Sequence, residues 1–235
     1  MVVLAIGCHP DDLEICAGGT LAKCAKRGDK VVMACLANGS AGHKVYSKEE
    51  IVAIRLKEAK ASADIIGAEF YSLGLDDMFV RRDYDEGVKK VSDLIRKVRP
   101  DFIITHGEHE YMVDHSITST IVFDATMAAT VDHYPSDLPT FDKFTPIFYM
   151  ENTSLINSFP DIFVDITDTI ETKIQMYSQH KSQIEWLKVH DNYDTCESIR
   201  NYSRTRGLQC DTGYVEGFTF CKQAHHLPLK RYLPE

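Results

Sequence analysis

The chain has 235 residues, of which 44% are hydrophobic and 26% are charged, and its formal net charge is -9. This composition is that of a globular protein able to bury a sizeable core. The acidic balance argues against a nucleic-acid-binding surface. Because the sequence contains no apolar run of about 20 residues, we also expect no membrane-spanning segment.

The seven cysteines are odd in number and include no CxxC pair, which favours reduced thiols. The apolar segment at the N-terminus is short and has no basic residues before it, so it does not resemble a signal peptide. Cys8 lies beside His9, but we interpret it as a small buried side chain rather than a metal ligand. These features predict a cytoplasmic protein.

The first predicted element is a buried strand over residues 2–6, a continuous apolar run rich in β-branched side chains. Gly7 and Pro10 end this strand. An imidazole and three carboxylates follow within six positions, in His9, Asp11, Asp12 and Glu14. This cluster is either an acidic solvated turn or a ligand site, because ligands of open α/β sheets bind at the carboxyl ends of the strands.

Strands and helices then alternate along the chain. Strands are predicted over residues 30–36, 69–73 and 101–105, and helices over residues 21–28, 48–66, 84–99 and 116–130. Ser47 and Glu50 form a capping box before the second of these helices. The alternation predicts an α/β fold, a Rossmann-like three-layer sandwich with a mostly parallel sheet and helices on both faces. Gly18 and Gly19 lie near the first helix but do not form a dinucleotide-binding fingerprint.

The C-terminal part is less regular. Short strands are predicted over residues 146–150 and 162–166, and one long helix over residues 167–188. A polar segment follows over residues 191–209, and then the sequence of residues 213–220. Because no linker composition interrupts the chain, we expect a single domain over residues 1–235.

A second polar cluster follows the fourth strand and contains His106, His109, Asp114 and His115. If the strands are parallel, this cluster and the one after the first strand lie at the same edge of the sheet. Together they supply imidazole and carboxylate ligands without thiolate. This set suits zinc in an open catalytic site, and iron or manganese nearly as well.

At this point the residues resemble a known family. The motif His9-Pro10-Asp11-Asp12-x-Glu14, followed by residues 17–20 and later by Asp114-His115, is similar to the LmbE-like / PIG-L family of zinc-dependent N-deacetylases. Residues 180–183 and 213–218 also look like segments of this family. The resemblance implies that His9, Asp12 and His115 bind Zn²⁺, although Fe²⁺ is an alternative, and that Asp11 is the general base. Asp114 would orient a histidine or tune a catalytic imidazole.

One position departs from the family pattern. Many members carry a histidine three residues before the Asp-His histidine, where it stabilises the oxyanion. Here that position is Met112, whose thioether cannot donate a hydrogen bond. Either the donor is missing, or another side chain replaces it: Tyr111, His109, His106, His225 or His226.

Four residues are candidates for substrate binding: Arg55, Asp77, His109 and Tyr111. Arg55 occupies a helix where the family often has an arginine near the ligand, and Asp77 follows the third strand. A solvated ion pair is an equal alternative for Arg55, and a turn position is one for Asp77.

The resulting hypothesis is a zinc-dependent N-deacetylase that acts on an N-acetylglucosamine-type sugar or conjugate and releases acetate. A metal amidase for another amide, such as a thiol conjugate or N-acyl amine, is the first alternative. A metal- or sugar-binding protein with little catalysis is the second, and a nucleotide-binding module is a distant third. The resemblance also implies a homo-oligomer. From the acidic balance and the lack of a long apolar run, we expect neither nucleic acid nor a membrane as partner.

Overall fold

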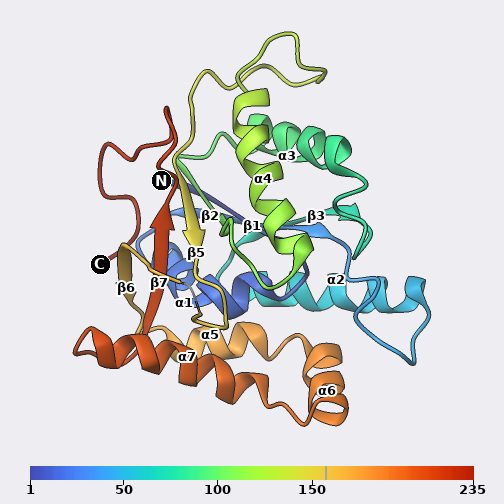
Figure 1. Cartoon of the computed structure of the whole chain (residues 1–235), viewed down its shortest axis with the longest axis vertical. Helices are drawn as coiled ribbons and strands as arrows, with labels where there is room; N and C mark the ends of the chain where they lie inside the picture. Colours follow the sequence, from blue (N-terminus) through green and yellow to red (C-terminus); the bar gives the residue numbers. More distant parts are fainter. Residues whose placement is uncertain (157) are drawn as a thin grey trace.

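The computed structural model describes residues 1–156 and 158–235. Within these residues the strands form one seven-stranded sheet in the order β3-β2-β1-β4-β5-β7-β6 (Figure 1). The strands are β1 (Val2–Gly7), β2 (Lys30–Ala37), β3 (Glu69–Leu75), β4 (Phe102–His106), β5 (Ile147–Met150), β6 (Ile162–Asp165) and β7 (Val215–Phe220). The first five in spatial order are parallel, and β7 and β6 are antiparallel additions. The predicted mostly parallel sheet is confirmed.

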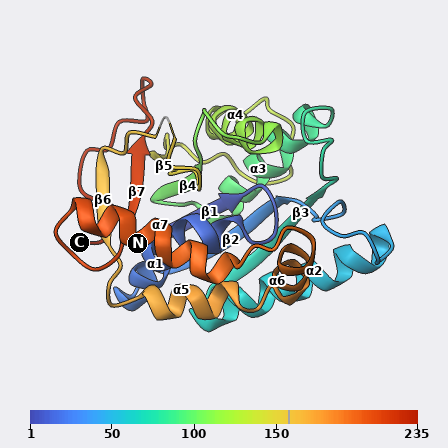
Figure 2. The ribbon, with the colours of Figure 1, turned by 60° about the horizontal axis from the view of Figure 1, so that its bottom comes forward.

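Helices cover both faces of this sheet (Figure 2). They are α1 (Asp12–Lys26), α2 (Lys48–Ile65), α3 (Tyr84–Val98), α4 (Val113–Ala128), α5 (Ile170–Tyr177), α6 (Lys181–His190) and α7 (Thr195–Gln209). Alternate residues of β1 enter two separate cores: Val3 packs in the core with α1 and α5, and Leu4 packs in the core with α3 and α4. Because both faces of β1 are buried, its sequence is continuously apolar rather than alternating.

The helix α1 begins at Asp12, nine residues before the predicted start. The prediction was wrong because two glycines weaken the helical signal. These glycines serve close packing instead. A Cβ at Gly18 would lie 3.2 Å from the side chain of Lys173 in α5, and one at Gly19 would lie within 2.7 Å of Ile166. Similarly, α4 begins at Val113, so Asp114 and His115 lie in its first turn.

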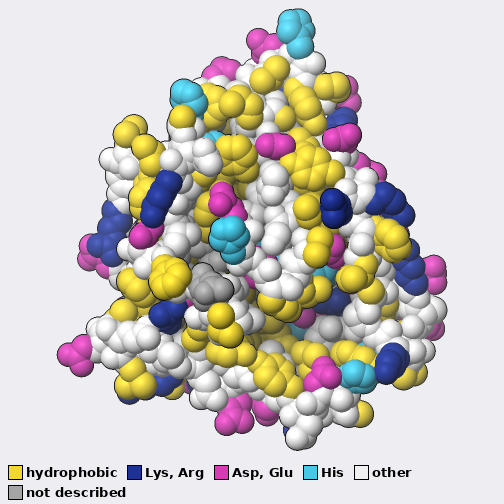
Figure 3. Space-filling view, viewed as in Figure 1, with side chains coloured by type: hydrophobic (Ala, Val, Ile, Leu, Met, Phe, Trp, Pro, Cys, Tyr) yellow, Lys and Arg dark blue, Asp and Glu magenta, His cyan; other side chains and the backbone are white. Residues whose placement is uncertain are grey.

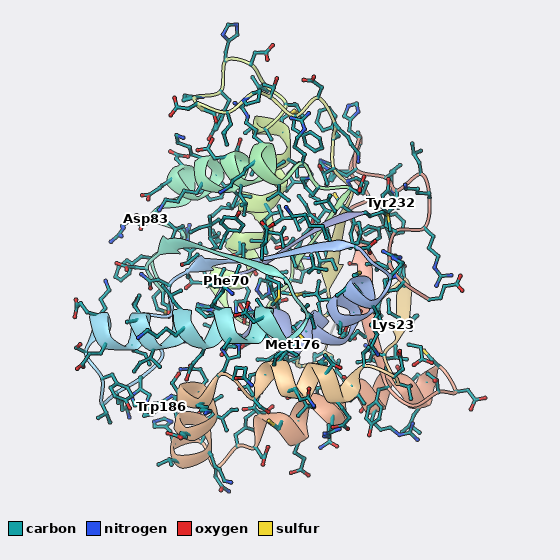
Figure 4. All side chains as sticks on the ribbon, turned by 180° about the vertical axis from the view of Figure 1, so that it is seen from behind. Lys23, Phe70, Asp83, Met176, Trp186 and Tyr232 are labelled. Carbon is teal, nitrogen blue, oxygen red and sulfur yellow. The ribbon has the colours of Figure 1, made fainter. Side chains whose placement is uncertain are left out.

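The single helix predicted over residues 167–188 is wrong, because the chain forms α5 and α6 with a break at residues 178–180. The break places the His180 side chain in the interior, where its Nε2 lies 3.2 Å from Glu14 Oε1. As a result α6 turns away from α5 and carries Trp186 (Figure 4). The Trp186 ring lies 5.1 Å from that of His43, in the loop before α2, between centroids and at a tilt of 48°.

The segment over residues 191–209, described from the sequence only as polar, contains α7. Only one of its buried positions has a large apolar side chain, Ile199; the others are Thr195, Ser203 and Gly207. The four positions recur every four residues but give no apolar periodicity. The helix is capped by Asp194, whose carboxylate accepts a hydrogen bond from the backbone N–H of Glu197. In the described part of the chain, no helix has the length and apolarity needed to cross a membrane.

Candidate metal centre

Three side chains converge at the carboxyl edge of the sheet, between the ends of β1 and β4. His9 lies in the turn after β1, Asp12 begins α1, and His115 lies in the first turn of α4. All three are buried. His9 Nδ1 lies 3.2 Å from His115 Nε2 and 3.6 Å from Asp12 Oδ2, and His115 Nε2 lies 3.4 Å from Asp12 Oδ1.

These distances fit a divalent metal ion. Tetrahedral zinc with ligand bonds of about 2.0–2.1 Å places its ligand atoms about 3.4 Å apart. Two imidazole nitrogens and a carboxylate that face one point also bring three lone pairs together, which a cation can satisfy at once. His9, Asp12 and His115 therefore form one group that could hold a metal, and it is the set that the family resemblance implies. Two overlapping groups have ligand atoms equally close together: Cys8, His9 and Asp114, and His106, Glu110 and His115.

Carboxylates stand behind both imidazoles. Asp114 Oδ2 lies 3.5 Å from His9 Nε2 and accepts a hydrogen bond of 2.6 Å from the backbone N–H of Met78. Glu110 Oε2 lies 3.7 Å from His115 Nδ1. Carboxylates in such positions orient metal-binding histidines and raise their basicity. The sequence interpretation expected Asp114 to orient a histidine, but it gave no role to Glu110.

His106, at the end of β4, closes a ring of polar contacts around the centre. Its Nε2 lies 3.0 Å from Asp12 Oδ2, its Nδ1 lies 3.6 Å from Glu110 Oε1, and its ring stacks on that of His115 at 4.1 Å. Burial alone would raise the pKa of Asp12, but the imidazoles of His115 and His106 hold that pKa well below its usual range. The carboxylate is thus ready to accept a cation.

Asp11 adopts a strained backbone next to the ligand Asp12. Its backbone φ is 137°, a value that residues other than glycine rarely adopt. Backbone strain of this kind is common at functional sites. Burial raises the pKa of Asp11 to about 6, and the guanidinium of Arg55, 3.2 Å from Asp11 Oδ1, opposes a larger rise. A carboxyl group with this pKa can exchange protons near neutral pH.

Arg55 reaches this position from α2 and is buried to 3% exposure. Its guanidinium donates to the carbonyl oxygen of Pro10 at 2.8 Å and to that of Gly39 at 3.3 Å. Asp77 lies behind it and accepts hydrogen bonds from the backbone N–H groups of Gly39 and Ala41. Arg55 and Asp77, two of the four candidates for substrate binding, therefore make contacts within the protein next to Asp11.

A cavity of about 310 Å³ opens beside the centre and is lined by two of the candidate ligands, Asp12 and His115. The Tyr111 ring lines it and lies edge-on to His115, with centroids 5.3 Å apart. His109 lines a neighbouring cavity of about 220 Å³, which shares Glu110 with the first. His226 lies elsewhere, where its Nδ1 contacts the Thr145 carbonyl, and His225 stacks on Phe144.

The fold and this centre define an α/β protein with an open His-Asp-His site at the carboxyl edge of a parallel sheet. The sequence profile of the PIG-L family, described as GlcNAc-PI de-N-acetylase, matches residues 4–126. The chain belongs to this family, as its motifs predicted.

The relatives of this chain include two kinds of enzyme. Diacetylchitobiose deacetylase from Thermococcus kodakarensis is 29% identical, over 93% of this chain and 82% of its own length. The 4-oxalmesaconate hydratase of Pseudomonas putida is 28% identical, over 72% and 69%. The crystal structure of the 4-carboxy-2-hydroxymuconate hydratase GalB from Pseudomonas putida superposes with a TM-score of 0.81 at 22% identity, over 97% of this chain and 99% of that one. This likeness establishes the shared fold.

Proposed function

We propose that the protein is a metal-dependent N-deacetylase that hydrolyses the acetamide of an N-acetylglucosamine-type substrate to acetate and a free amine. The observation that carries this proposal is the convergence of His9, Asp12 and His115 beside Asp11. The similarity to a deacetylase over most of both chains supports the choice of reaction. We also infer that residues 1–235 act as one domain, because β7 from the C-terminal end completes the sheet.

The roles follow from the contacts. A zinc ion held by the three ligands, or Fe²⁺ in the same set, would supply Lewis acidity and increase the acidity of water. Asp11 would accept a proton as the water oxygen attacks the amide carbon, and would then donate a proton to the departing nitrogen. The C–N bond breaks in this second step, so that acetate and an amine leave.

The remaining polar groups would hold these parts in place. Arg55 contacts both the carboxylate of Asp11 and the preceding carbonyl group, so it fixes the direction of the base. Asp114 and Glu110 would orient the imidazoles of His9 and His115. Tyr111, which lines the cavity, is the side chain we propose as oxyanion donor in place of the residue absent at Met112.

A hydratase is the second candidate, because the Pseudomonas putida relative and GalB share this chain's ancestry or fold. A water molecule activated at the same centre could add to a carbon–carbon double bond. That reaction releases no acetate, so the products distinguish it from deacetylation. A metal amidase acting on a thiol conjugate or another N-acyl amine would share the site and differ in the amide that it cleaves.

The test is acetate release from a panel of N-acetyl sugars and N-acyl amines by the zinc-loaded protein, with Asp11→Asn as the matched variant. We expect acetate from the parent and at least a hundredfold less from Asp11→Asn, about what a general base contributes. Both proteins should bind equal zinc, because Asp11 is not a ligand. Zinc and sugar binding without turnover, or equal activity of parent and variant, would contradict the proposal.

A further inference from the structure

The cavity beside the candidate ligands has two walls of different origin. On one side lie the candidate ligands Asp12 and His115, with His9 beside them outside the lining, and we call this side the ligand wall. It comes from the part of the chain that the family profile matches. The opposite wall, which we call the α6–α7 wall, consists of Leu187, Tyr193, Thr195 and Tyr202. These four residues lie beyond residue 126, the last matched position. Selectivity encoded there can therefore change without changing the chemistry of the ligand wall.

No lysine or arginine lines this cavity among the residues that the structure describes. Its charged side chains, apart from imidazoles, are the carboxylates of Asp12 and Glu110. An anionic group on the substrate would meet no compensating positive charge on the α6–α7 wall.

The basic residues of a neighbouring cavity are already paired. A smaller neighbouring cavity, which shares Cys16 and Tyr202 with the first, is lined by Lys173 and Arg206. Lys173 Nζ lies 2.6 Å from Glu216 Oε1, and both side chains are almost fully buried. Arg206 is paired with the buried carboxylate of Glu151. Redirecting either cation to a substrate would leave a buried carboxylate without its partner.

The α6–α7 wall offers hydroxyl groups instead of charge. Tyr193 Oη and Tyr202 Oη lie 2.5 Å apart, so the two phenols form one hydrogen-bonded pair. Phenols remain neutral below about pH 10 and can both donate and accept. Leu187 adds apolar surface beside them. On the face seen in Figure 3, hydrophobic side chains lie along α7, and charged side chains and a histidine accompany them near α6. Rings next to hydroxyls complement a sugar, which has apolar faces and hydroxyl edges.

We propose that the α6–α7 wall selects an uncharged, hydroxyl-bearing N-acyl substrate and discriminates against phosphorylated or carboxylated analogues. This inference rests on the proposed deacetylase function and narrows it. It also disfavours the hydratase alternative, since 4-carboxy-2-hydroxymuconate, after which the GalB hydratase is named, carries carboxylates.

The experiment compares kcat/KM for acetate release from N-acetylglucosamine, its methyl glycoside, and its 1- and 6-phosphates. We expect the neutral compounds to react at least about tenfold faster than the phosphates. Leu187→Lys should raise kcat/KM for the phosphates, relative to that for the neutral compounds, by about tenfold. The reason is that opposite charges about 8 Å apart still attract each other noticeably at an effective dielectric constant of about 20. Val189→Lys is the matched control, because it adds the same charge to α6 at a position that is 86% exposed.

The outcomes separate the two proposals. Equal kcat/KM for neutral and phosphorylated substrates would overturn the selectivity while leaving the deacetylase function intact. An identical response to Leu187→Lys and Val189→Lys would also overturn it, because the effect would then be a general surface charge. Tyr202→Phe provides a second variant. It should lower kcat/KM for the neutral substrates without changing the zinc content. Absence of acetate from every compound would remove the proposed function and this inference together.

Discussion

The ligand wall and the α6–α7 wall face each other across one cavity, but the sequence predicts the position of the first much better than that of the second. The ligand wall follows directly from the sheet. Because β1 and β4 are parallel neighbours, with Val3 opposite Phe102 and Ile6 opposite Thr105, the turns after them must meet. The α6–α7 wall depends on where two later helices pack. The comparison suggests that the sheet edge sets the chemistry and that these helices set the choice of substrate.

The largest effect is expected from the ligand wall itself. Asp12→Ala removes the one carboxylate of the candidate ligand set, and it also removes the 3.0 Å contact between Asp12 Oδ2 and His106 Nε2, which leaves the backbone N–H of Cys8 as the partner of that nitrogen. We expect the variant to lose its zinc and at least about a thousandfold of kcat, because the metal supplies several kcal/mol of charge stabilisation. Metal analysis and acetate assays check this. Full zinc content and activity in Asp12→Ala would place the centre elsewhere.

Arg55→Met should lower kcat by roughly 10- to 100-fold, since small displacements of a catalytic group are costly. KM should change little if Arg55 holds Asp11 rather than the substrate. The base acts when deprotonated, so activity should rise with pH through the pKa of Asp11. Removing the nearby positive charge raises that pKa, and the acidic limb should move to higher pH. An increase in KM alone, with an unshifted limb, would instead favour substrate binding by Arg55.

Glu110→Gln tests the carboxylate behind His115. The substitution retains the shape of the side chain but removes its charge, 3.7 Å from His115 Nδ1. We expect zinc affinity to fall about 10- to 100-fold, as is typical for residues that support a metal ligand. Competition with a chelator of known affinity measures the effect. An unchanged affinity would assign Glu110 to packing alone.

The smallest effect is expected on the α6–α7 wall. Tyr193→Phe should reduce kcat/KM for a neutral sugar by about three- to tenfold, the equivalent of one neutral hydrogen bond. Zinc content and the pH profile should match those of the parent. If this variant lost zinc, the two walls would not be independent, and the separation of chemistry from selectivity would fail.

Much of the ligand wall could be predicted because local rules determine it. An apolar strand followed by His9 and Asp12 identifies a sheet-edge site, and the capping box of Ser47 and Glu50 marks the start of α2 as predicted. The role of Glu110 was not predicted, because its contacts depend on the path of the chain after β4. That path brings its carboxylate against two imidazoles, and sequence spacing alone does not show it.

The α6–α7 wall could not be predicted for a different reason. The break at residues 178–180 is stabilised by burial of His180 against Glu14, a contact between segments 166 positions apart in the sequence. The buried stripe of α7 has few apolar side chains, so hydrophobic periodicity is weak there. Tertiary contacts, rather than local propensity, therefore place Tyr193 and Tyr202 at the cavity.

The central claim is that one metal ion at His9, Asp12 and His115 supports hydrolysis. Stepwise addition of zinc to chelator-treated protein, with acetate release measured at each step, tests it most directly. We expect activity to be absent without metal, to rise in proportion to bound zinc and to reach its maximum at one ion per chain. Full activity in the metal-free protein, or saturation of zinc binding in a His115→Ala variant equal to that of the parent, would contradict it.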